Sequence, residues 1–300
     1  MNGAPVWRPT GVIWTGDRAQ LEWSTFSGDT PRCSPIRIGA DLALTCGSDR
    51  RCTGLWRSGR RLHCPTGTPI AAAARTAQCP SCQALDRSSS IAADTRLEDP
   101  RPVAVYLAHH GSVIKVGITA VERGTTRLLE QGALASTVIS TGTLPGARRA
   151  ENLVTTVLGL PDRASAQRKR AARIHPGTPG RRAEELLAAA GRSAQLSWPQ
   201  GQDRQQATVI DHTGTYHLPP GGLAPVAALR PLTPARTIAG RVACLIGGDL
   251  YLETAQGLVL LDTRLLTGWA LDRAAAGTLL TAELEPLHTS SEEQEQDALF

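Results

Sequence analysis

The chain has 300 residues and a formal net charge of +5 at pH 7, and 41% of its residues are hydrophobic against 20% charged. These proportions are ordinary for a globular protein, and the length predicts two or three modules. No apolar run approaches the roughly 18 residues of a membrane span, and the N-terminus lacks the apolar core of a signal peptide. We therefore expect a cytoplasmic protein with no membrane partner. The positive charge is compatible with a nucleic-acid partner without identifying one.

Residues 1–99 form the predicted N-terminal module, which begins with short alternating runs and ends in a linker. Residues 11–14 and 19–23 read as strands, and Gly16-Asp17 between them favours a hairpin turn. A run of serines and an Asp-Pro pair near the end of this segment are typical of a linker. We expect a β segment followed by a cysteine module.

The cysteine module holds the strongest metal-binding pattern in the chain. Cys79 and Cys82 form a CxxC knuckle, which presents two thiolates to one tetrahedral ion, and Cys52 and Cys64 complete the predicted set. In a cytoplasmic protein such a cluster is more often a metal site than a disulfide set. A structural zinc ion is the predicted occupant. The alternatives are a redox dithiol or buried free cysteines, and the spare candidate ligands are Cys33, Cys46 and His63.

A predicted hairpin opens the core module, which we place at residues 100–192. Residues 103–109 alternate in the manner of a strand, and residues 113–118 are β-branched and apolar around a single charge. Gly117 inside the second strand indicates a close approach of another group. The pattern that follows predicts a helix at 123–131, a strand at 134–139 and a helix at 146–158.

The order of Tyr106, Lys115-Val116-Gly117, Arg127 and Glu151 on these elements resembles the GIY-YIG nuclease superfamily. The resemblance implies that Glu151 holds a catalytic Mg²⁺ and that Arg127 stabilises charge on the phosphorus centre. It also implies that Tyr106, with Lys115 nearby, helps to deprotonate the attacking water. Lys115 stands where Tyr is usual, and Gln131 stands where many members carry His.

Further motifs are similar to those of one uncharacterised bacterial and archaeal family, a domain of unknown function that pairs a cysteine module with a GIY-YIG-like core. The motifs are Cys52-Thr53-Gly54, the CxxC knuckle, RLLEQGA at residues 127–133 and Gly-Asp-Leu-Tyr-Leu at 248–252. The resemblance covers residues 1 to about 280. It implies no assigned reaction.

Lysine is rare in this chain, because only Lys115 and Lys169 among the 32 basic residues are lysines. Lys can shift its pKa and take part in proton transfer, whereas Arg stays charged. Lys169 lies between Arg168 and Arg170 in a strongly basic segment. Those three residues are the predicted nucleic-acid contacts, and the alternative is a solvated helix face.

Residues 193–284 form the predicted C-terminal module, in which short apolar runs alternate with Gly, Pro and Asp, as in a small β barrel or sandwich. Residues 285–300 are acidic and polar and are predicted to be disordered. The fold class is therefore α+β, with a GIY-YIG-like hairpin-helix-strand-helix core between an N-terminal β and zinc module and a small C-terminal β domain.

Two functions fit these features. One is a Mg²⁺-dependent endonuclease that hydrolyses DNA or RNA phosphodiesters and carries a structural zinc ion. The other is a non-catalytic, zinc-containing nucleic-acid-binding protein on the same fold, which the glutamine at position 131 favours. A zinc-stabilised interaction scaffold without nucleic acid is a third reading. Since a fold does not fix a function, the site must decide between them.

Overall fold

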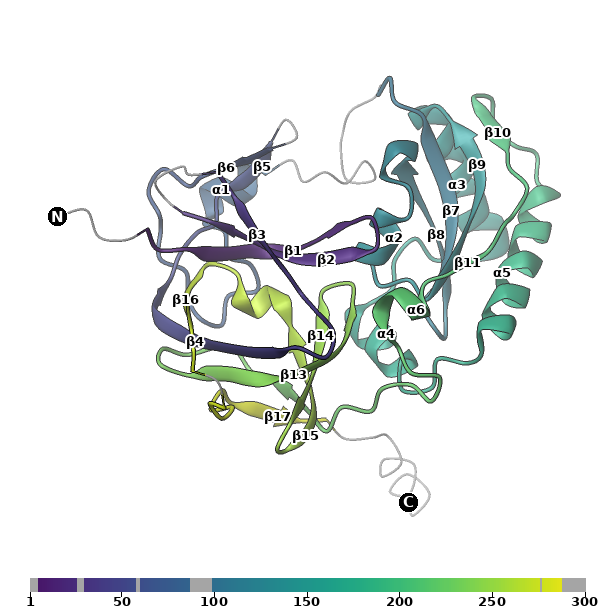
Figure 1. Ribbon diagram of the computed structural model, residues 1–300. Coiled ribbons are helices and arrows are strands. Elements are labelled where there is room, and N and C mark those ends of the chain that lie inside the picture. Colours follow the sequence, from purple (N-terminus) through teal and green to yellow (C-terminus); the bar gives the residue numbers. More distant parts are fainter. Residues whose placement is uncertain (1–4, 26–29, 58–59, 87–98, 276, 288–300) are drawn as a thin grey trace, which may run out of the picture.

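A five-stranded antiparallel sheet grows from the predicted hairpin and forms the centre of the core module (Figure 1). The computed structural model of the chain describes residues 5–25, 30–57, 60–86, 99–275 and 277–287. Tyr106 on one hairpin strand lies opposite Gly117 on the other. The strands are β7 (Val103–His109), β8 (Ile114–Ala120), β9 (Ala135–Gly142), β10 (Gln202–Arg204) and β11 (Ile210–Asp211), with β9 beside β7 and both short strands on β9.

The two faces of β7 serve different purposes, because successive side chains of a strand point to opposite faces. Val103, Val105 and Leu107 are fully buried against α3 (Leu144–Leu158) and α5 (Pro179–Ala194). Tyr106 points to the other face, where it packs with Leu128 of α2 (Thr126–Glu130). The predicted order of hairpin, helix, strand and helix is confirmed, with α2 shorter than expected and preceded by a 3-10 turn, η1 (Val121–Arg123).

Helix α3 has clear start and stop signals. The hydroxyl of Thr143 accepts a hydrogen bond from the backbone N–H of Gly146 at 3.3 Å, and a proline sits in the first turn. Gly159 ends the helix in a left-handed conformation. The helix therefore starts two residues before the predicted boundary of residue 146, and Glu151 lies near its middle.

A seven-stranded sheet lies beside the core and draws on both ends of the chain (Figure 1). Its strand β4 (Asp41–Arg50) pairs with β13 (Thr237–Ile246) and with β16 (Trp269–Arg273). The module boundaries predicted from the sequence, after residue 99 and before residue 193, assign β4 to a different module from its partner strands. Alternation of apolar and polar residues predicts a strand but not the strand beside it. The remaining strands of this sheet are β12 (Ala227–Leu229), β14 (Asp249–Thr254), β15 (Gly257–Asp262) and β17 (Leu284–Pro286).

The smaller elements complete a mixed α+β structure, as the sequence predicted. The hairpin at Gly16-Asp17 is confirmed, with β1 and β2 paired around it. These elements are β1 (Arg8–Thr15), β2 (Arg18–Ser24), β3 (Arg32–Pro35), β5 (Leu55–Arg57), β6 (Arg60–Leu62), α1 (Pro80–Leu85), α4 (Ala166–Ala172), α6 (Thr213–Tyr216) and η2 (Thr263–Leu266).

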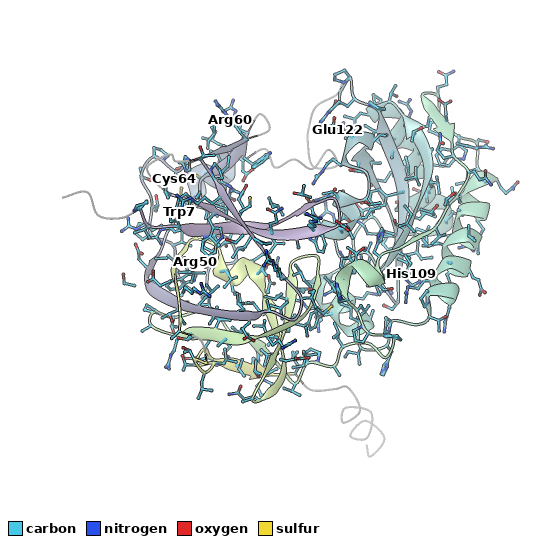
Figure 2. The ribbon with its side chains drawn as sticks, viewed as in Figure 1. Trp7, Arg50, Arg60, Cys64, His109 and Glu122 are labelled. Atoms are coloured by element: carbon cyan, nitrogen blue, oxygen red, sulfur yellow. The ribbon has the colours of Figure 1, made fainter. Side chains whose placement is uncertain are left out.

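The side chain of Arg50 connects the cysteine module to the seven-stranded sheet through hydrogen bonds (Figure 2). Its side chain is buried at the end of β4. Its Nη1 donates to the backbone carbonyls of Ala71, Ala72 and Ala74 at 2.9–3.1 Å, and its Nε donates to the carbonyl of Thr267 at 2.9 Å. Because these carbonyls lie just upstream of the CxxC knuckle, the arginine fixes where that knuckle sits.

Two predicted segments fall partly outside the described residues. The predicted linker spans residues 83–100. Its residues 83–85 belong to α1, and its residues 87–98 lie outside the described residues. The predicted disordered tail begins at residue 285, but Glu285 and Pro286 belong to β17 and pair with β12. Residues 288–300 of that tail lie outside the described residues.

Candidate functional site

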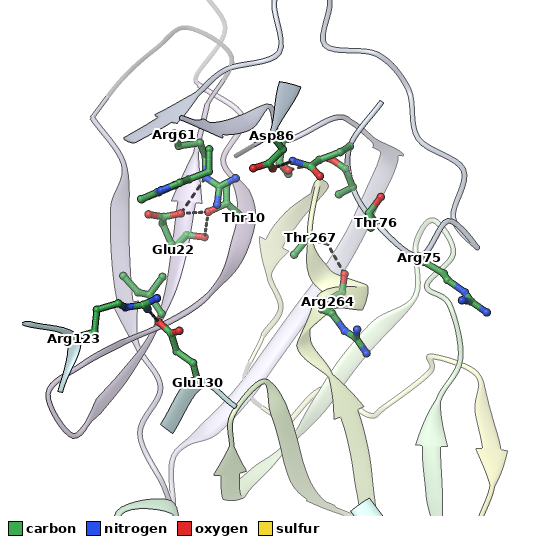
Figure 3. A pocket seen from close by; sticks show the side chains of 15 residues that line it. Thr10, Glu22, Arg61, Arg75, Thr76, Asp86, Arg123, Glu130, Arg264 and Thr267 are labelled. Atoms are coloured by element: carbon green, nitrogen blue, oxygen red, sulfur yellow. Dashed lines mark hydrogen bonds and ion pairs between the residues drawn. The ribbon is translucent and has the colours of Figure 1, made fainter. Parts of the chain in front are cut away.

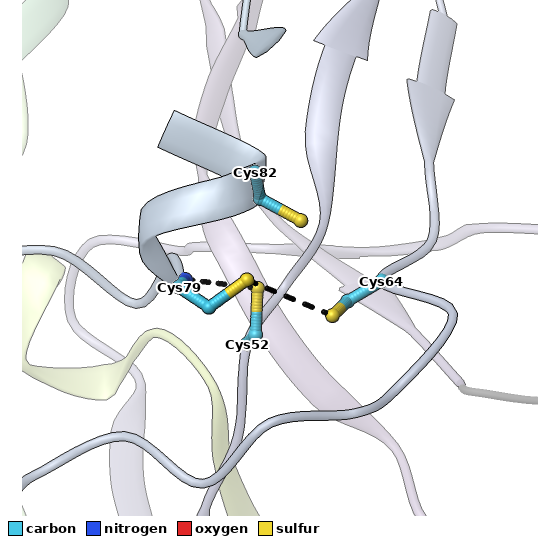
Figure 4. A group of neighbouring side chains, drawn as sticks. All are labelled: Cys52, Cys64, Cys79 and Cys82. Carbon is cyan, nitrogen blue, oxygen red and sulfur yellow. Dashed lines mark hydrogen bonds between the residues drawn. The ribbon is translucent and has the colours of Figure 1, made fainter. Parts of the chain in front are cut away.

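The structure brings the four predicted metal-binding cysteines together (Figure 4). Cys52, Cys64, Cys79 and Cys82 are all buried, and their sulfur atoms lie within 4.8 Å of one another. Tetrahedral coordination at a Zn–S distance of about 2.3 Å requires sulfur atoms roughly 3.8 Å apart, and the Sγ atoms of Cys64 and Cys79 are 4.0 Å apart. The cluster is therefore compatible with a zinc site.

Hydrogen bonds lower the pKa values of Cys64 and Cys79, whereas burial raises those of Cys52 and Cys82. The Sγ of Cys52 accepts from the backbone N–H of Cys79 at 3.2 Å and of Gly54 at 3.4 Å. Burial raises the pKa of Cys64, but hydrogen bonds from Thr66 and the neighbouring backbone outweigh it and lower that pKa to about 5. A thiol that loses its proton easily is the form that binds metal.

Gly54 allows the loop after Cys52 to turn tightly. Its φ of +78° lies in the left-handed region, and a Cβ there would meet the carbonyl oxygen of Leu62 at 1.9 Å. A side chain at this position would therefore push the segment that leads from β6 to Cys64 away from Cys52. The three spare candidate ligands stay outside the cluster: Cys33 is exposed on β3, Cys46 is buried in the main core, and His63 contributes no atom to it.

Tyr106 and Gly117 fit each other across the hairpin, as the glycine in the strand suggested. A Cβ at Gly117 would lie 2.5 Å from the hydroxyl oxygen of Tyr106, so only glycine leaves room for the tyrosine. Gln131 donates its side-chain amide to that hydroxyl at 3.0 Å. Burial raises the pKa of Tyr106, so the hydroxyl keeps its proton at neutral pH.

Lys115 is buried on the same face of the hairpin, with 8% of its surface exposed. Its Nζ lies 5.8 Å from the centre of the Tyr106 ring and donates weakly to the backbone carbonyl of Asp162 at 3.4 Å. Burial, helped by the charge of Arg127, lowers the pKa of Lys115 to about 8. A share of this amine is therefore neutral near physiological pH.

Arg127 and Glu151 lie within electrostatic reach of the same two residues. Burial is the largest cause of both pKa shifts, since it raises the pKa of Tyr106 and lowers that of Lys115. In addition, the charge of Arg127 lowers both pKa values and the charge of Glu151 raises both. Arg127 also donates to Glu130 at 3.4 Å. Burial is the main cause that raises the pKa of Glu151. The charges of Arg127 on α2 and Glu151 on α3 thus act on both Tyr106 on β7 and Lys115 on β8, and we refer to these four residues as the Tyr106 site.

The predicted nucleic-acid contacts on α4 lie in three different environments. Arg168 is exposed. Arg170 donates to Asp249 at 3.1 Å and to Asp262 at 2.8 Å, so its charge is already paired. Lys169 points the other way and donates to the backbone carbonyl of Gln131 at 2.8 Å. Contact with nucleic acid therefore stays a prediction for Arg168, while Lys169 joins the Tyr106 site.

The placement of Lys169 is the feature that sequence reasoning missed. A basic run of this kind is usually a solvated face, and nothing in its spacing shows that one member turns inward. Lysine scarcity was the available signal, since both lysines of the chain lie at this site. Arg173, also on this segment, is buried and donates to Asp249 at 2.6 Å and to the hydroxyl of Tyr251 at 3.2 Å.

A polar pocket of about 450 Å³ lies between the cysteine module and the core (Figure 3). Arg61 of β6 lines it from the cysteine module and pairs with Glu22 of β2 at 3.2 Å. Arg123 and Glu130 line it from the core and pair with each other at 2.6 Å. Because Glu130 also binds Arg127, the pocket reaches the edge of the Tyr106 site.

Comparison with known proteins gives the chain a family. In the part of the chain that the structure describes, every helix is too short or too polar to cross a bilayer. No curated protein and no solved structure matches the chain. A family model described as "Protein of unknown function (DUF2797)" matches residues 39–271, which include both the cysteine cluster and the Tyr106 site. The chain therefore belongs to this family of unknown function.

Proposed function

We propose that the chain is a Mg²⁺-dependent endonuclease that hydrolyses nucleic-acid phosphodiesters and carries a structural zinc ion in its cysteine cluster. The observation that supports the proposal is that the charges of Arg127 and Glu151 act on both Tyr106 and Lys115. These residue types supply a carboxylate for a hard cation, a fixed positive charge and a group that exchanges protons near pH 8. The resemblance to the GIY-YIG superfamily supports the same roles.

Glu151 is the ligand for Mg²⁺ in this proposal. Its side chain is half-buried, and no described residue forms an ion pair with it, so its oxygens are available to a cation. Mg²⁺ binds few carboxylates and keeps several waters. When bound, the ion supplies charge stabilisation at the phosphoryl oxygens. Arg127 adds a fixed positive charge close enough to act on Lys115, and in this proposal it stabilises the charge that develops on the phosphorus centre during hydrolysis.

Lys115 is the proton acceptor in this proposal, because its pKa of about 8 leaves part of the amine neutral. Tyr106 stays protonated and, held by Gln131, orients the attacking water through its hydroxyl. The cysteine cluster fits four thiolates around one zinc ion, which leaves no open position for chemistry. Zinc therefore stabilises the fold and takes no part in hydrolysis.

Replacement of Glu151 by Gln tests the proposal. Glu151→Gln keeps the shape of the side chain and removes the charge, so Mg²⁺-dependent cleavage should fall by at least about 10²-fold. Binding of nucleic acid without Mg²⁺ should be unchanged. Glu184→Gln, an exposed glutamate on α5, is the matched control and should cleave as wild type does. Single-stranded, double-stranded and branched DNA, and RNA, are the substrates to assay.

A non-catalytic nucleic-acid-binding protein is the second candidate function. The observation that favours it is the pairing of Tyr106 with Gln131, where a histidine is usual in the superfamily, since an amide cannot exchange a proton. If wild type cleaves none of the four substrates with Mg²⁺ but binds at least one of them, this second function replaces the first.

A further inference from the structure

The only two lysines of the chain contact the hydrogen-bonded residues Tyr106 and Gln131. Lys169 of α4 donates to the backbone carbonyl of Gln131 at 2.8 Å, and the amide of Gln131 donates to the Tyr106 hydroxyl at 3.0 Å. Lys115 of β8 lies over the Tyr106 ring, 5.8 Å from its centre. Helix α3 and the loop after it separate the two lysines in the sequence, so only the fold brings them together.

Both ammonium groups lack a direct carboxylate partner among the described residues. Within the described ranges, Lys115 and Lys169 form no ion pair with a carboxylate, and each donates only to a backbone carbonyl. Buried charges are normally paired. Arg170 and Arg173 on the same segment follow that rule, because both bind Asp249. Asp249 is thus committed to the arginines, whereas the charges of Glu151 and Asp162 reach Lys115 without an ion pair.

Three cationic side chains act on one another at this point. Burial, helped by the charge of Lys115, lowers the pKa of Lys169 to about 8. His110 adds no charge, because burial and the charge of Lys169 lower its pKa well below the ordinary value, and its Nδ1 donates to the Gly132 carbonyl at 3.1 Å. The two ammonium groups and Arg127 therefore repel one another, and the charge of Glu151 opposes this repulsion at Lys115. A bound anion would stabilise all three cations further.

We propose that Lys169 and the protonated form of Lys115 make a two-lysine phosphate-binding site that holds a phosphate group of the nucleic acid beside Tyr106. Lys115 acts as proton acceptor only after it has lost this proton. The identity of the phosphate as part of a nucleic acid rests on the proposed function, whereas the binding of phosphate itself does not. Lys binds phosphate as a compact point charge and needs no planar approach. Lys169 is thus a binding residue of the site, contributed by a helix outside the predicted hairpin-helix-strand-helix core.

The seven-stranded sheet fixes the position of Lys169. Arg170 and Arg173 tie α4 to Asp249 at the start of β14, and Arg170 also reaches Asp262 at the end of β15. These ion pairs lie on the side of α4 that faces the sheet, so Lys169 is directed toward Gln131 instead. The phosphate site consequently needs both the core module and the seven-stranded sheet.

Labelling of the two lysines tests the site in the intact protein. Reductive ¹³C-methylation gives one resonance for each lysine and one for the α-amino group, which serves as an internal reference. Titration with inorganic phosphate, without Mg²⁺ and at constant ionic strength in chloride, should shift both lysine resonances with a single dissociation constant. It should also raise both pKa values, because an anion stabilises the ammonium form. Equal responses to phosphate and chloride would overturn the proposal.

A variant pair provides an independent measurement on unlabelled protein. Lys169→Met should weaken binding of inorganic phosphate, measured by calorimetry, at least about tenfold, the scale of a lost hydrogen bond to a charged group. Arg168→Met, its exposed neighbour, should bind as wild type does. Equal affinity in Lys169→Met and wild type would refute the site. If Lys169→Met does not fold, the labelling titration of wild type decides alone.

The outcomes separate this inference from the proposed nuclease. Glu151→Gln should bind phosphate at least as tightly as wild type, because it removes a negative charge that acts on Lys115. Phosphate binding without cleavage in wild type would leave the two-lysine site intact and remove the nuclease. Cleavage that persists in Lys169→Met, with phosphate affinity unchanged, would retain the nuclease and remove the site.

Discussion

The side-chain amide of Gln131 donates to the hydroxyl of Tyr106 at 3.0 Å, and the backbone carbonyl of the same glutamine accepts from Lys169 at 2.8 Å. One residue at the end of α2 therefore joins the hairpin to α4. Because Tyr106 is buried, its hydroxyl has little access to water and depends on this partner.

Removal of the Tyr106 hydroxyl should separate its chemical role from its structural one. Tyr106→Phe should slow cleavage by about 10²-fold, the scale of a misplaced reacting group, because the attacking water loses the hydroxyl that orients it. It should also lower the free energy of unfolding by about 1 kcal/mol. Tyr216→Phe is the matched control, since it loses a buried hydrogen bond of 3.3 Å to the Leu129 carbonyl. Cleavage rates and urea unfolding of both variants check this, and equal losses of activity would contradict it.

The cysteine cluster should hold about one zinc ion per chain. Cys79→Ser combined with Cys82→Ser removes the CxxC knuckle, so bound zinc should fall to near zero and the surrounding loops should lose stability. Elemental analysis of protein prepared under reducing conditions measures the zinc. Cys33→Ser, an exposed cysteine outside the cluster, should retain the metal. Zinc-free wild type would show that the cluster is not a zinc site.

The ion pairs around Asp262 should make stability depend on pH in a defined window. Burial raises the pKa of Asp262, but hydrogen bonds from Arg264 and Arg170 lower it to about 2. A depressed folded-state pKa adds stability above the unfolded value near 4 and loses it as pH falls toward 2. Asp262→Asn should therefore cost about 2 kcal/mol at pH 7.

Urea unfolding at two pH values measures this effect. The stability difference between wild type and Asp262→Asn should shrink at pH 3, because wild type then loses part of its own ion pairing. Asp272→Asn, on an exposed position of β16, should differ little from wild type at either pH. An Asp262→Asn penalty that is equal at both values would show that charge does not stabilise this contact.

Arg168 and Arg170 should differ in their effect on nucleic-acid binding. If Arg168 contacts a phosphate, Arg168→Ala should reduce the slope of log affinity against log salt by about 1. Arg192→Ala, an exposed arginine at the end of α5, is the control and should leave the slope unchanged. Arg170→Ala should chiefly lower stability, because it frees Asp249 and Asp262. A slope unchanged in Arg168→Ala would place this residue on a solvated face.

Local signals predicted much of the structure. The alternation at residues 103–109 and the glycine at 117 located β7, β8 and the close fit of Tyr106. The CxxC knuckle with Cys52 and Cys64 identified a cluster that the structure does bring together. In each case the information lies in spacing along a few residues, which the period of a strand or the geometry of a knuckle converts into position.

Long-range pairings were beyond such signals. Nothing near β4 indicates that it lies between β13 and β16, since every exposed strand edge offers the same hydrogen-bonding groups. The inward turn of Lys169 was hidden for a similar reason. It depends on Asp249 and Asp262, about 80 and 90 residues further along the chain, which bind Arg170 and so fix which side of α4 faces the core.

The position of β4 also sets an order of events during synthesis. Its two neighbours in the sheet are made about 190 and 220 residues later, so β4 leaves the ribosome long before it has a partner. The core strands β7 to β9 lie close in sequence and pair early, since closing a short loop costs less entropy. Residues 41–50 consequently pass through a period as an unpaired strand edge, the state in which a nascent chain is most exposed to aggregation.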